Sequence, residues 1–288
     1  MATVLKHSAE PEGYRLIDVR PISGALGAEL LGVDLSRLTD DAFEEVHRAL
    51  LQYSVIFFRG QDMDPEQHKA FGRRFGELNV HPVYEPLPGH PEILPVIKEA
   101  DALNNIGDTW HTDVTFVDEP PLGSILYARQ VPPYGGDTLF ANLYMAFETL
   151  SEEMQRMLSG LSAVHSNAYL TAPDANRNAT RSTKLQKLDI ITAVHPVVRT
   201  HPETGRKALF VNWPFTERFD GMTREESQPL LDYLFRHASR PEFTCRFRWA
   251  EKSVAFWDNR CTHHYALNDY QGYRREMHRV TINGDRPY

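Results

Sequence analysis

Two groups of residues with metal-binding side chains lie far apart in this sequence. Trp110-His111-Thr112-Asp113 holds the first group, and the adjacent pair His263-His264 near the C-terminus is the second. Residues i and i+2 of a strand point to the same face, so an extended segment here would project His111 and Asp113 together. One histidine from a distant strand would complete a two-histidine, one-carboxylate site. Such a site binds Fe(II) and leaves positions for a cosubstrate and dioxygen.

The residue types alone leave several interpretations open. Either His263 or His264 fits the third ligand position. Zinc accepts the same ligand types, so a zinc hydrolase, or a metal-binding protein without oxidase activity, is an alternative. A surface histidine beside a solvated aspartate in a polar turn would bind no metal at all.

Two arginines near the C-terminus favour an anion-binding site. Arg275 and Arg279 alternate with other residues along one expected strand, so both guanidinium groups share a face with Met277 and Thr281. If that face points inward, both buried charges need anionic partners, because an unpaired buried charge is strongly unfavourable. Protein carboxylates could supply them. A dicarboxylate cosubstrate and an acidic substrate could supply them instead, through bidentate hydrogen bonds.

Strands at both ends of the chain, with helices interspersed, would have to position these groups. Capping residues and helical apolar spacing predict helices that begin after Thr39 and after Asp64. Helical signals recur at 144–160 and 223–238, and strands are expected at 54–58, 121–142, 253–257 and 277–282. The polar segment 166–190 is typical of an active-site lid or a disordered loop. The pattern predicts an α+β protein, with a β-sandwich or jelly roll buttressed by helices.

Composition limits the function classes. The chain has 288 residues, 41% of them hydrophobic and 24% charged, without internal repeats, so we expect one domain over 1–288. A net charge of −8 argues against a nucleic-acid partner. No apolar run reaches 18 residues, so we expect no membrane partner. The only two cysteines, Cys245 and Cys261, predict no disulfide framework and a reducing cytoplasm.

Several motifs together resemble a known family, the taurine dioxygenase group of Fe(II)- and 2-oxoglutarate-dependent dioxygenases. They run in the family order from about residue 15 to the end and are specific as a set. The matching pieces are Phe75-Gly76-Glu77, His81-Pro82-Val83-Tyr84, Trp110 to Phe116, Gly135-Gly136-Asp137-Thr138, His195 to Pro202, Trp257-Asp258-Asn259-Arg260, His264-Tyr265-Ala266 and Met277-His278-Arg279.

The resemblance implies a double-stranded β-helix, which is a form of jelly roll, and a complete active site. It implies that His111, Asp113 and His264 bind Fe(II), with His263 at a position that is not a ligand. Thr138 and Arg275 match the positions that hold the distal carboxylate of 2-oxoglutarate. The positions that match the family's substrate contacts are His81, Arg279, the backbone of Val114, and the apolar walls Tyr84 and Phe215.

The implied reaction is hydroxylation of a small anionic organic substrate with O2 and 2-oxoglutarate. A sulfonate, either taurine or an alkyl sulfonate, would release sulfite, succinate and CO2. One departure concerns taurine: Ile106 and Gly107 stand where taurine-hydroxylating members have polar residues for the substrate amine. An alkyl sulfate ester or an aryloxyalkanoic acid is therefore the alternative substrate. The family resemblance also suggests a homo-oligomer, either a dimer or a tetramer.

Overall fold

The largest element of the structure is a seven-stranded sheet. The structure is a computed structural model and describes residues 13–81, 84–171 and 189–288, so most of the segment expected to form a lid lies outside the described residues. The strand order is β1-β2-β3-β13-β5-β15-β4, and every pairing is antiparallel except β2 with β3. The strands are β1 (Asp18–Pro21), β2 (Ala28–Leu31), β3 (Val55–Phe58), β13 (Val254–Asp258), β5 (Gly123–Gln130), β15 (Arg275–Ile282) and β4 (Ile93–Lys98).

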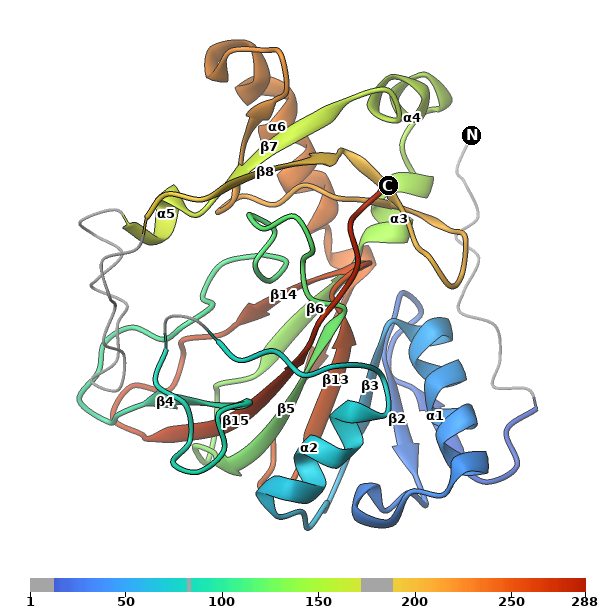
Figure 1. The fold of residues 1–288 in the computed structure, drawn as a ribbon, viewed down its shortest axis with the longest axis vertical. Helices are drawn as coiled ribbons and strands as arrows, with labels where there is room; N and C mark the ends of the chain where they lie inside the picture. Colours follow the sequence, from blue (N-terminus) through green and yellow to red (C-terminus); the bar gives the residue numbers. More distant parts are fainter. Residues whose placement is uncertain (1–12, 82–83, 172–188) are drawn as a thin grey trace.

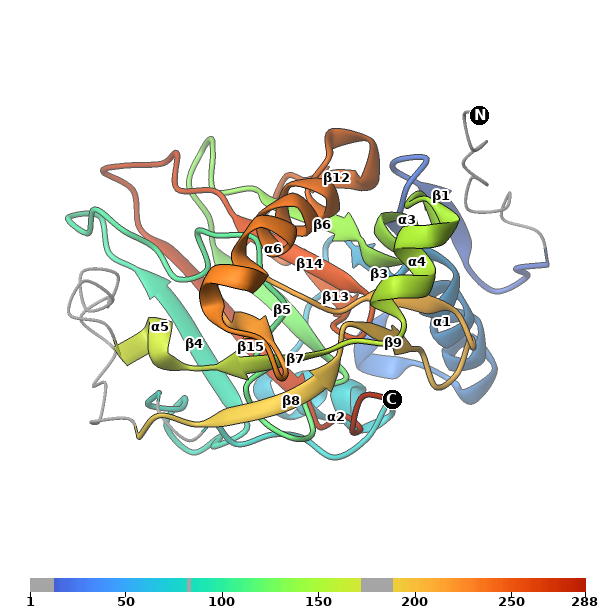
Figure 2. The ribbon, with the colours of Figure 1, turned by 90° about the horizontal axis from the view of Figure 1, so that it is seen from above.

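Three smaller sheets complete the strand framework. The sheet β12-β6-β14 carries one of the candidate ligand histidines; its strands are β12 (Thr244–Phe247), β6 (Thr138–Asn142) and β14 (Thr262–Ala266). A second sheet has the order β11-β7-β8 and consists of β11 (Thr216–Phe219), β7 (Ser162–Ser166) and β8 (Thr192–Pro196). The remaining pair is β10 (Lys207–Leu209) with β9 (Val198–Thr200). The chain ends beside β9 (Figure 2), where Thr200 N–H donates to Tyr288 O at 2.7 Å.

Helices lie outside these sheets. Figure 1 shows α1 and α2 beside the seven-stranded sheet, while α6 lies with β7 and β8 at the opposite end of the molecule. The helices are α1 (Asp40–Tyr53), α2 (Pro65–Arg73), α3 (Leu143–Glu148), α4 (Glu152–Leu158), α5 (Ala168–Thr171) and α6 (Arg224–Ala238), with 3-10 turns at Leu35–Arg37 and Pro241–Phe243. None of the described helices is long and apolar enough to cross a membrane.

The predicted helix starts are confirmed, and one predicted helical segment is divided in two. Thr39 caps α1 by accepting from Ala42 N–H, and Asp64 with Gln67 forms a capping box on α2. The helical signals over 144–160 are confirmed, but the segment forms two helices, α3 and α4. Ser151 interrupts it: the Ser151 hydroxyl accepts from Met154 N–H and caps a new helix.

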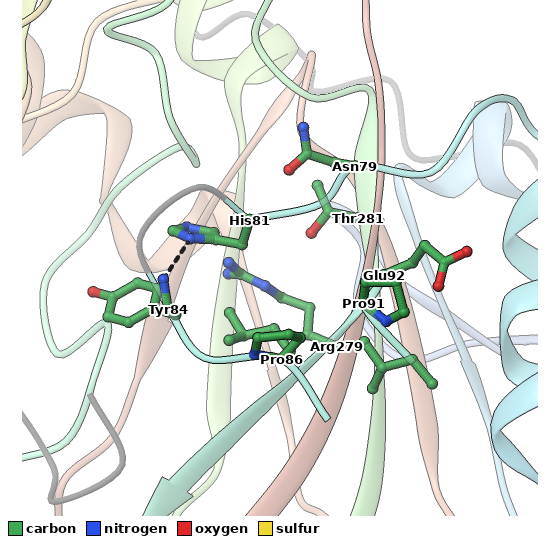
Figure 3. A pocket seen from close by; sticks show the side chains of 10 residues that line it. Asn79, His81, Tyr84, Pro86, Pro91, Glu92, Arg279 and Thr281 are labelled. Carbon is green, nitrogen blue, oxygen red and sulfur yellow. Dashed lines mark hydrogen bonds between the residues drawn. The ribbon is translucent and has the colours of Figure 1, made fainter. Parts of the chain in front are cut away.

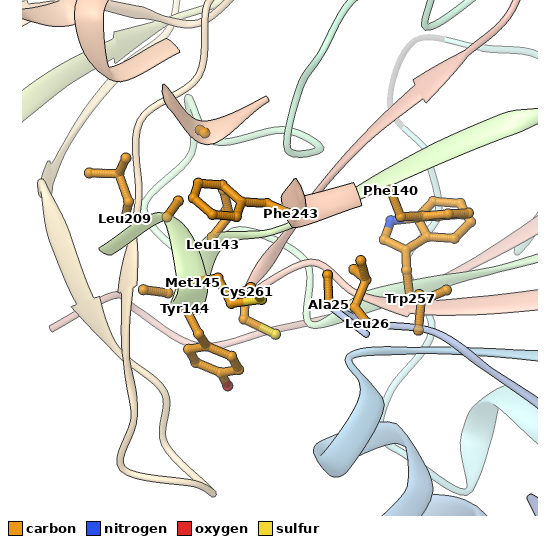
Figure 4. Close-up of a cluster of buried hydrophobic side chains, with 14 of the residues drawn as sticks. Ala25, Leu26, Phe140, Leu143, Tyr144, Met145, Leu209, Phe243, Trp257 and Cys261 are labelled. Carbon is orange, nitrogen blue, oxygen red and sulfur yellow. The ribbon is translucent and has the colours of Figure 1, made fainter. Parts of the chain in front are cut away.

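The central strands separate two hydrophobic layers. Side chains alternate along a strand, so neighbouring residues of β3 and β13 enter different clusters. Phe57 and Trp257 belong to the larger cluster, which includes the residues drawn in Figure 4. Ile56 and Phe256 belong to the other cluster, with buried residues of α1 and α2. This arrangement confirms the α+β class, with a jelly-roll core supported by helices.

Candidate metal centre and anion sites

Backbone pairing brings His111 next to His264. His264 lies in β14, and its main chain forms an isolated β-bridge with His111, with N···O distances of 3.1 and 2.9 Å. The two imidazole centroids are 4.1 Å apart. The expected extended segment around His111 is only partly right, because the bridge is a single residue pair and a turn follows from Asp113. Strand alternation therefore does not explain how Asp113 joins the two histidines.

Asn259 fixes Asp113 through its backbone. Asn259 Oδ1 accepts from Asp113 N–H at 2.9 Å, and Asn259 Nδ2 donates to Asp113 O and to Pro121 O, both at 3.1 Å. On the other side, Ser124 Oγ donates to Asp113 Oδ2 at 3.4 Å. All three side chains are buried. Asn259 lies inside a matched motif, but its residue type and spacing predicted no role for it.

The three candidate ligand atoms can share one ion. Asp113 Oδ1 is 3.7 Å from His111 Nε2 and 3.8 Å from His264 Nε2. These separations are too long for hydrogen bonds. Two ligand atoms bound to one ion at about 2.1 Å each lie at most about 4.2 Å apart, so both separations fit. His263 is also buried but does not belong to this cluster.

The protonation states also suit a metal ion. His111 Nδ1 lies 2.7 Å from Thr109 O, which can only accept, so Nδ1 carries the hydrogen and Nε2 presents its lone pair. Burial alone would raise the pKa of Asp113, but Arg279 and the neighbouring histidines lower it to about 2. Burial, followed by the charge of His111, lowers the pKa of His264 well below its usual range. Metal ions bind these forms, the ionised carboxylate and the neutral imidazole.

Arg275 is a buried cation that forms no ion pair with the described residues. The Arg275 side chain is buried, and its Nε and Nη2 atoms have no hydrogen-bond partner among the described residues. Its guanidinium carbon lies 5.7 Å from the ring centroid of Trp249, whose Nε1 donates to Thr138 Oγ1 at 3.0 Å. Trp249 thus links the two residues expected to hold 2-oxoglutarate. Because an unpaired buried charge is unfavourable, this arrangement fits an anion that comes from outside the protein.

Arg279 lies beside the candidate metal centre. Its Nη1 is 3.4 Å from Asp113 Oδ1. It lines a pocket together with His81 and Tyr84, and Figure 3 shows the three side chains turned toward one another. Tyr84 N–H donates to His81 Nδ1 at 3.2 Å, so His81 Nε2 carries the hydrogen and can donate. Burial, followed by Arg279, lowers the pKa of His81 to about 4, which keeps it neutral.

The two remaining predicted contacts, Val114 and Phe215, do not line the pocket of Arg279. Val114 follows Asp113 directly and has a φ of 54°. Phe215 is buried against Phe116, with ring centroids 5.1 Å apart. Phe215 does not line the pocket of Arg279, so the structure does not bring it together with Tyr84 as part of one wall.

Comparison with known proteins identifies the family. The sequence model described as "Taurine catabolism dioxygenase TauD, TfdA family" matches residues 18–281. The chain belongs to the TauD/TfdA family. It is therefore an oxidoreductase of the 2-oxoglutarate-dependent dioxygenase class, as the resemblance implied.

Individual relatives of this TauD/TfdA family member cover almost the whole chain. It is 40% identical to the alkylsulfatase of Acinetobacter baylyi, over 93% of this chain and 86% of that protein. It is 39% identical to an alpha-ketoglutarate-dependent sulfate ester dioxygenase of Pseudomonas putida, over 94% and 91% of the two chains. A crystal structure of a taurine dioxygenase from Burkholderia xenovorans superimposes with a TM-score of 0.81 at 41% identity, covering 95% and 91%.

Gly107, four residues before His111, leaves room for the ring of this candidate ligand. A Cβ atom added to Gly107 would lie 3.2 Å from His111 Cε1, and the φ of Gly107 is 83°. Ala266 N–H donates to Gly107 O at 2.8 Å, which ties this backbone to the end of β14. Gly107 therefore keeps space open against the ligand ring, while the neighbouring Ile106 is half-buried and apolar.

Proposed function

We propose that this chain is an Fe(II)- and 2-oxoglutarate-dependent dioxygenase that hydroxylates the carbon next to the oxyanion group of a small organic anion. The observation that carries the proposal is the buried Arg275, which forms no ion pair among the described residues and whose Nε and Nη2 have no hydrogen-bond partner there. A dicarboxylate cosubstrate supplies the missing anion. A zinc hydrolase needs no dicarboxylate cosubstrate.

Each predicted site residue then has a role. His111, Asp113 and His264 would hold Fe(II) through Nε2, Oδ1 and Nε2. Arg275 and the Thr138 hydroxyl would bind the distal carboxylate of 2-oxoglutarate. When bound, the iron and 2-oxoglutarate supply oxidation by O2, with one oxygen atom entering succinate and the other the substrate.

The substrate anion would bind between Arg279 and His81. Arg279 contributes charge, and neutral His81 donates from Nε2. The backbone N–H of Val114 is the third donor in this assignment. Tyr84, which lines the pocket with Arg279 and His81, would exclude water from the carbon chain. A compact –SO3 group can accept from all three donors at once.

Two substrate types with this group are candidates. The residue departures at Ile106 and Gly107 and the names of the two relatives at about 40% identity favour an alkyl sulfate ester. Its hydroxylated form breaks into aldehyde and sulfate. The structural similarity to a taurine dioxygenase supports the sulfonate predicted from the sequence, whose hydroxylated form breaks into aldehyde and sulfite.

A product assay separates these candidates. Iron-loaded protein is incubated with 2-oxoglutarate, O2 and one probe at a time: hexyl sulfate, hexanesulfonate, taurine or phenoxyacetate. We expect succinate and hexanal in equal amounts, with sulfate from hexyl sulfate or sulfite from hexanesulfonate. Hexanol and sulfate without succinate would instead show a hydrolase and contradict the proposal.

Location and assembly stay predictions. The cytoplasm is expected from Cys245 and Cys261, which are buried and unpaired. A homo-oligomer and a single domain over 1–288 rest on the resemblance and the absence of repeats. Size-exclusion chromatography with light scattering measures the oligomeric state directly.

A further inference from the structure

The turn after Asp113 contains a residue in an unfavourable conformation. Val114 has a φ of 54°, in the left-handed region that β-branched residues rarely adopt. Such a conformation persists only where the surrounding structure holds it, and it is often found at functional sites. Val114 itself is only partly buried. The residues next to it in the chain must therefore be what fixes its backbone.

The Val114 amide is an unused hydrogen-bond donor. Within residues 13–81, 84–171 and 189–288, no group accepts a hydrogen bond from Val114 N–H. The preceding residue is Asp113, whose carboxylate contacts Arg279. The free donor thus belongs to the residue directly after Asp113, the carboxylate that contacts the arginine we assign to the substrate anion.

Thr115 anchors the other side of this turn. The Thr115 side chain is fully buried, and its Oγ1 accepts from Asn212 Nδ2 at 3.0 Å and lies 2.9 Å from His165 Nδ1. His195 Nε2 is 2.9 Å from Thr115 O and 3.0 Å from Val117 O, so its N–H is shared by both carbonyl groups.

These anchors belong to a different sheet from the ligand His264. His165 lies in β7 and His195 in β8, and Asn212 precedes β11, the third strand of that sheet. Asn212 is itself fixed, because its N–H donates to Thr216 Oγ1 at 2.9 Å. The turn is therefore held between the sheet that carries His264 and the sheet β11-β7-β8.

We propose that Thr115 is a positioning residue, which acts through Asn212 and His165 to hold the Val114 amide toward the substrate anion opposite Arg279. This inference rests on the proposed function, since it assigns the anion to that site. In this role Thr115 contacts no substrate, but it determines the affinity of the site for the substrate anion. It also gives the buried polar cluster around Thr115 a purpose besides packing.

Two substitutions of Thr115 separate this role from packing. Thr115→Val keeps the shape and removes the hydroxyl, whereas Thr115→Ser keeps the hydroxyl. With hexyl sulfate as the probe, Thr115→Val should raise the KM about tenfold, equivalent to about 1.4 kcal/mol. The KM for 2-oxoglutarate and the Fe(II) affinity should stay within about twofold of the wild type, and Thr115→Ser should restore the KM for hexyl sulfate.

Asn212→Ala is the second variant, for the case that Thr115→Val does not fold, and it should raise the same KM. A crystal structure of either variant gives a readout apart from activity, because φ of residue 114 should leave the left-handed region. An unchanged φ with an unchanged KM for hexyl sulfate, or an equal rise in the KM for 2-oxoglutarate, overturns the inference. If the wild type turns over no probe, the proposed function fails, and φ of residue 114 in the variants still decides the inference.

Discussion

The main chains of His111 and His264 are hydrogen-bonded to each other in both directions, at 3.1 and 2.9 Å. The backbone therefore sets the distance between the two candidate ligands before any metal binds. Asn259 fixes the third ligand, Asp113, in the same manner through main-chain atoms. Such preorganisation lowers the cost of ordering the side chains when the ion arrives.

Adjacent histidines of β14 should differ in metal binding. His264→Ala removes a candidate ligand, so we expect the Fe(II) affinity to fall at least about a hundredfold. His263→Ala is the matched control, because His263 is equally buried on the same strand but lies outside the cluster. Iron content after dialysis measures binding, and circular dichroism checks folding. Equal iron loss in two folded variants would contradict the assignment.

Removing the charge of Arg275 should stabilise the protein while it abolishes cosubstrate binding. Burial lowers the pKa of Arg275, and no acidic side chain pairs with it among the described residues. Arg275→Met should therefore raise the free energy of unfolding without 2-oxoglutarate by about 1 kcal/mol or more. The KM for 2-oxoglutarate should rise at least about a hundredfold.

Urea unfolding in the absence of 2-oxoglutarate measures the stability change. Arg246→Met is the control, since Arg246 is half exposed and pairs with Asp137 at 2.6 Å. We expect no gain in stability from that change. A loss of stability in Arg275→Met would show that the buried charge is compensated within the protein.

An ion pair between α1 and the loop after β9 should make stability fall as the pH rises. Glu203 Oε2 is 2.8 Å from His47 Nε2, and this hydrogen bond raises the pKa of His47. Because the pKa of His47 is higher in the folded state, the ion pair stabilises the protein fully below the pKa of an unfolded histidine, about 6.5. This stabilisation disappears as the pH rises through the pKa of His47 in the folded protein. Both side chains are about one-third exposed, so we expect about 0.2–1 kcal/mol. His47→Gln should remove this decline in urea unfolding as the pH rises above the unfolded value of about 6.5.

For Glu203, the acidic residue of the same pair, stability should instead fall as the pH falls. The hydrogen bond from His47, with Arg260 in addition, lowers the pKa of Glu203 to about 2. Its contribution is therefore complete above the unfolded value, about 4.3, and is lost as the pH falls toward 2. Glu203→Gln should flatten the stability profile in that acidic range. An unchanged profile would mean that the pair does not persist in solution.

Gly107 should be intolerant of even one methyl group. Gly107→Ala places a Cβ 3.2 Å from His111 Cε1 at a φ of 83°, so it should displace the ligand ring and reduce Fe(II) affinity about tenfold or more. Gly221→Ala is the matched control, because its φ is 77° and nothing lies within 4 Å of the added atom. The control should lose about 1–2 kcal/mol of stability and no iron affinity.

Residue types and spacing predicted which candidate ligands lie together better than they predicted the path of the chain between them. The strand alternation of Arg275 and Arg279 was correct, because β15 pairs on both sides and its inward face is fixed. The strand around His111 was predicted too long. The side chain of Asn259, more than a hundred positions away, replaces strand pairing there, and residue spacing carries no signal for such a contact.

Apolar spacing also failed to predict local structure where a single polar side chain began a second helix. The 144–160 segment has helical apolar spacing, yet Ser151 begins a new helix, and Met157 is left 46% exposed. Trp249 and Thr115 were missed because a buried tryptophan or threonine is most often simple packing. Only their partners, Thr138 and Asn212, distinguish them.

Alternation along the central strands offers a route for protein engineering. Trp257 faces the layer of the metal site, and its ring lies 4.7 Å from the ring of His264. Its neighbour Phe256 faces α1 and α2 and reaches no candidate ligand. Thermostable variants of this enzyme can therefore be sought by redesigning the layer that faces α1 and α2. Such substitutions would leave the side chains beside the candidate metal ligands unchanged.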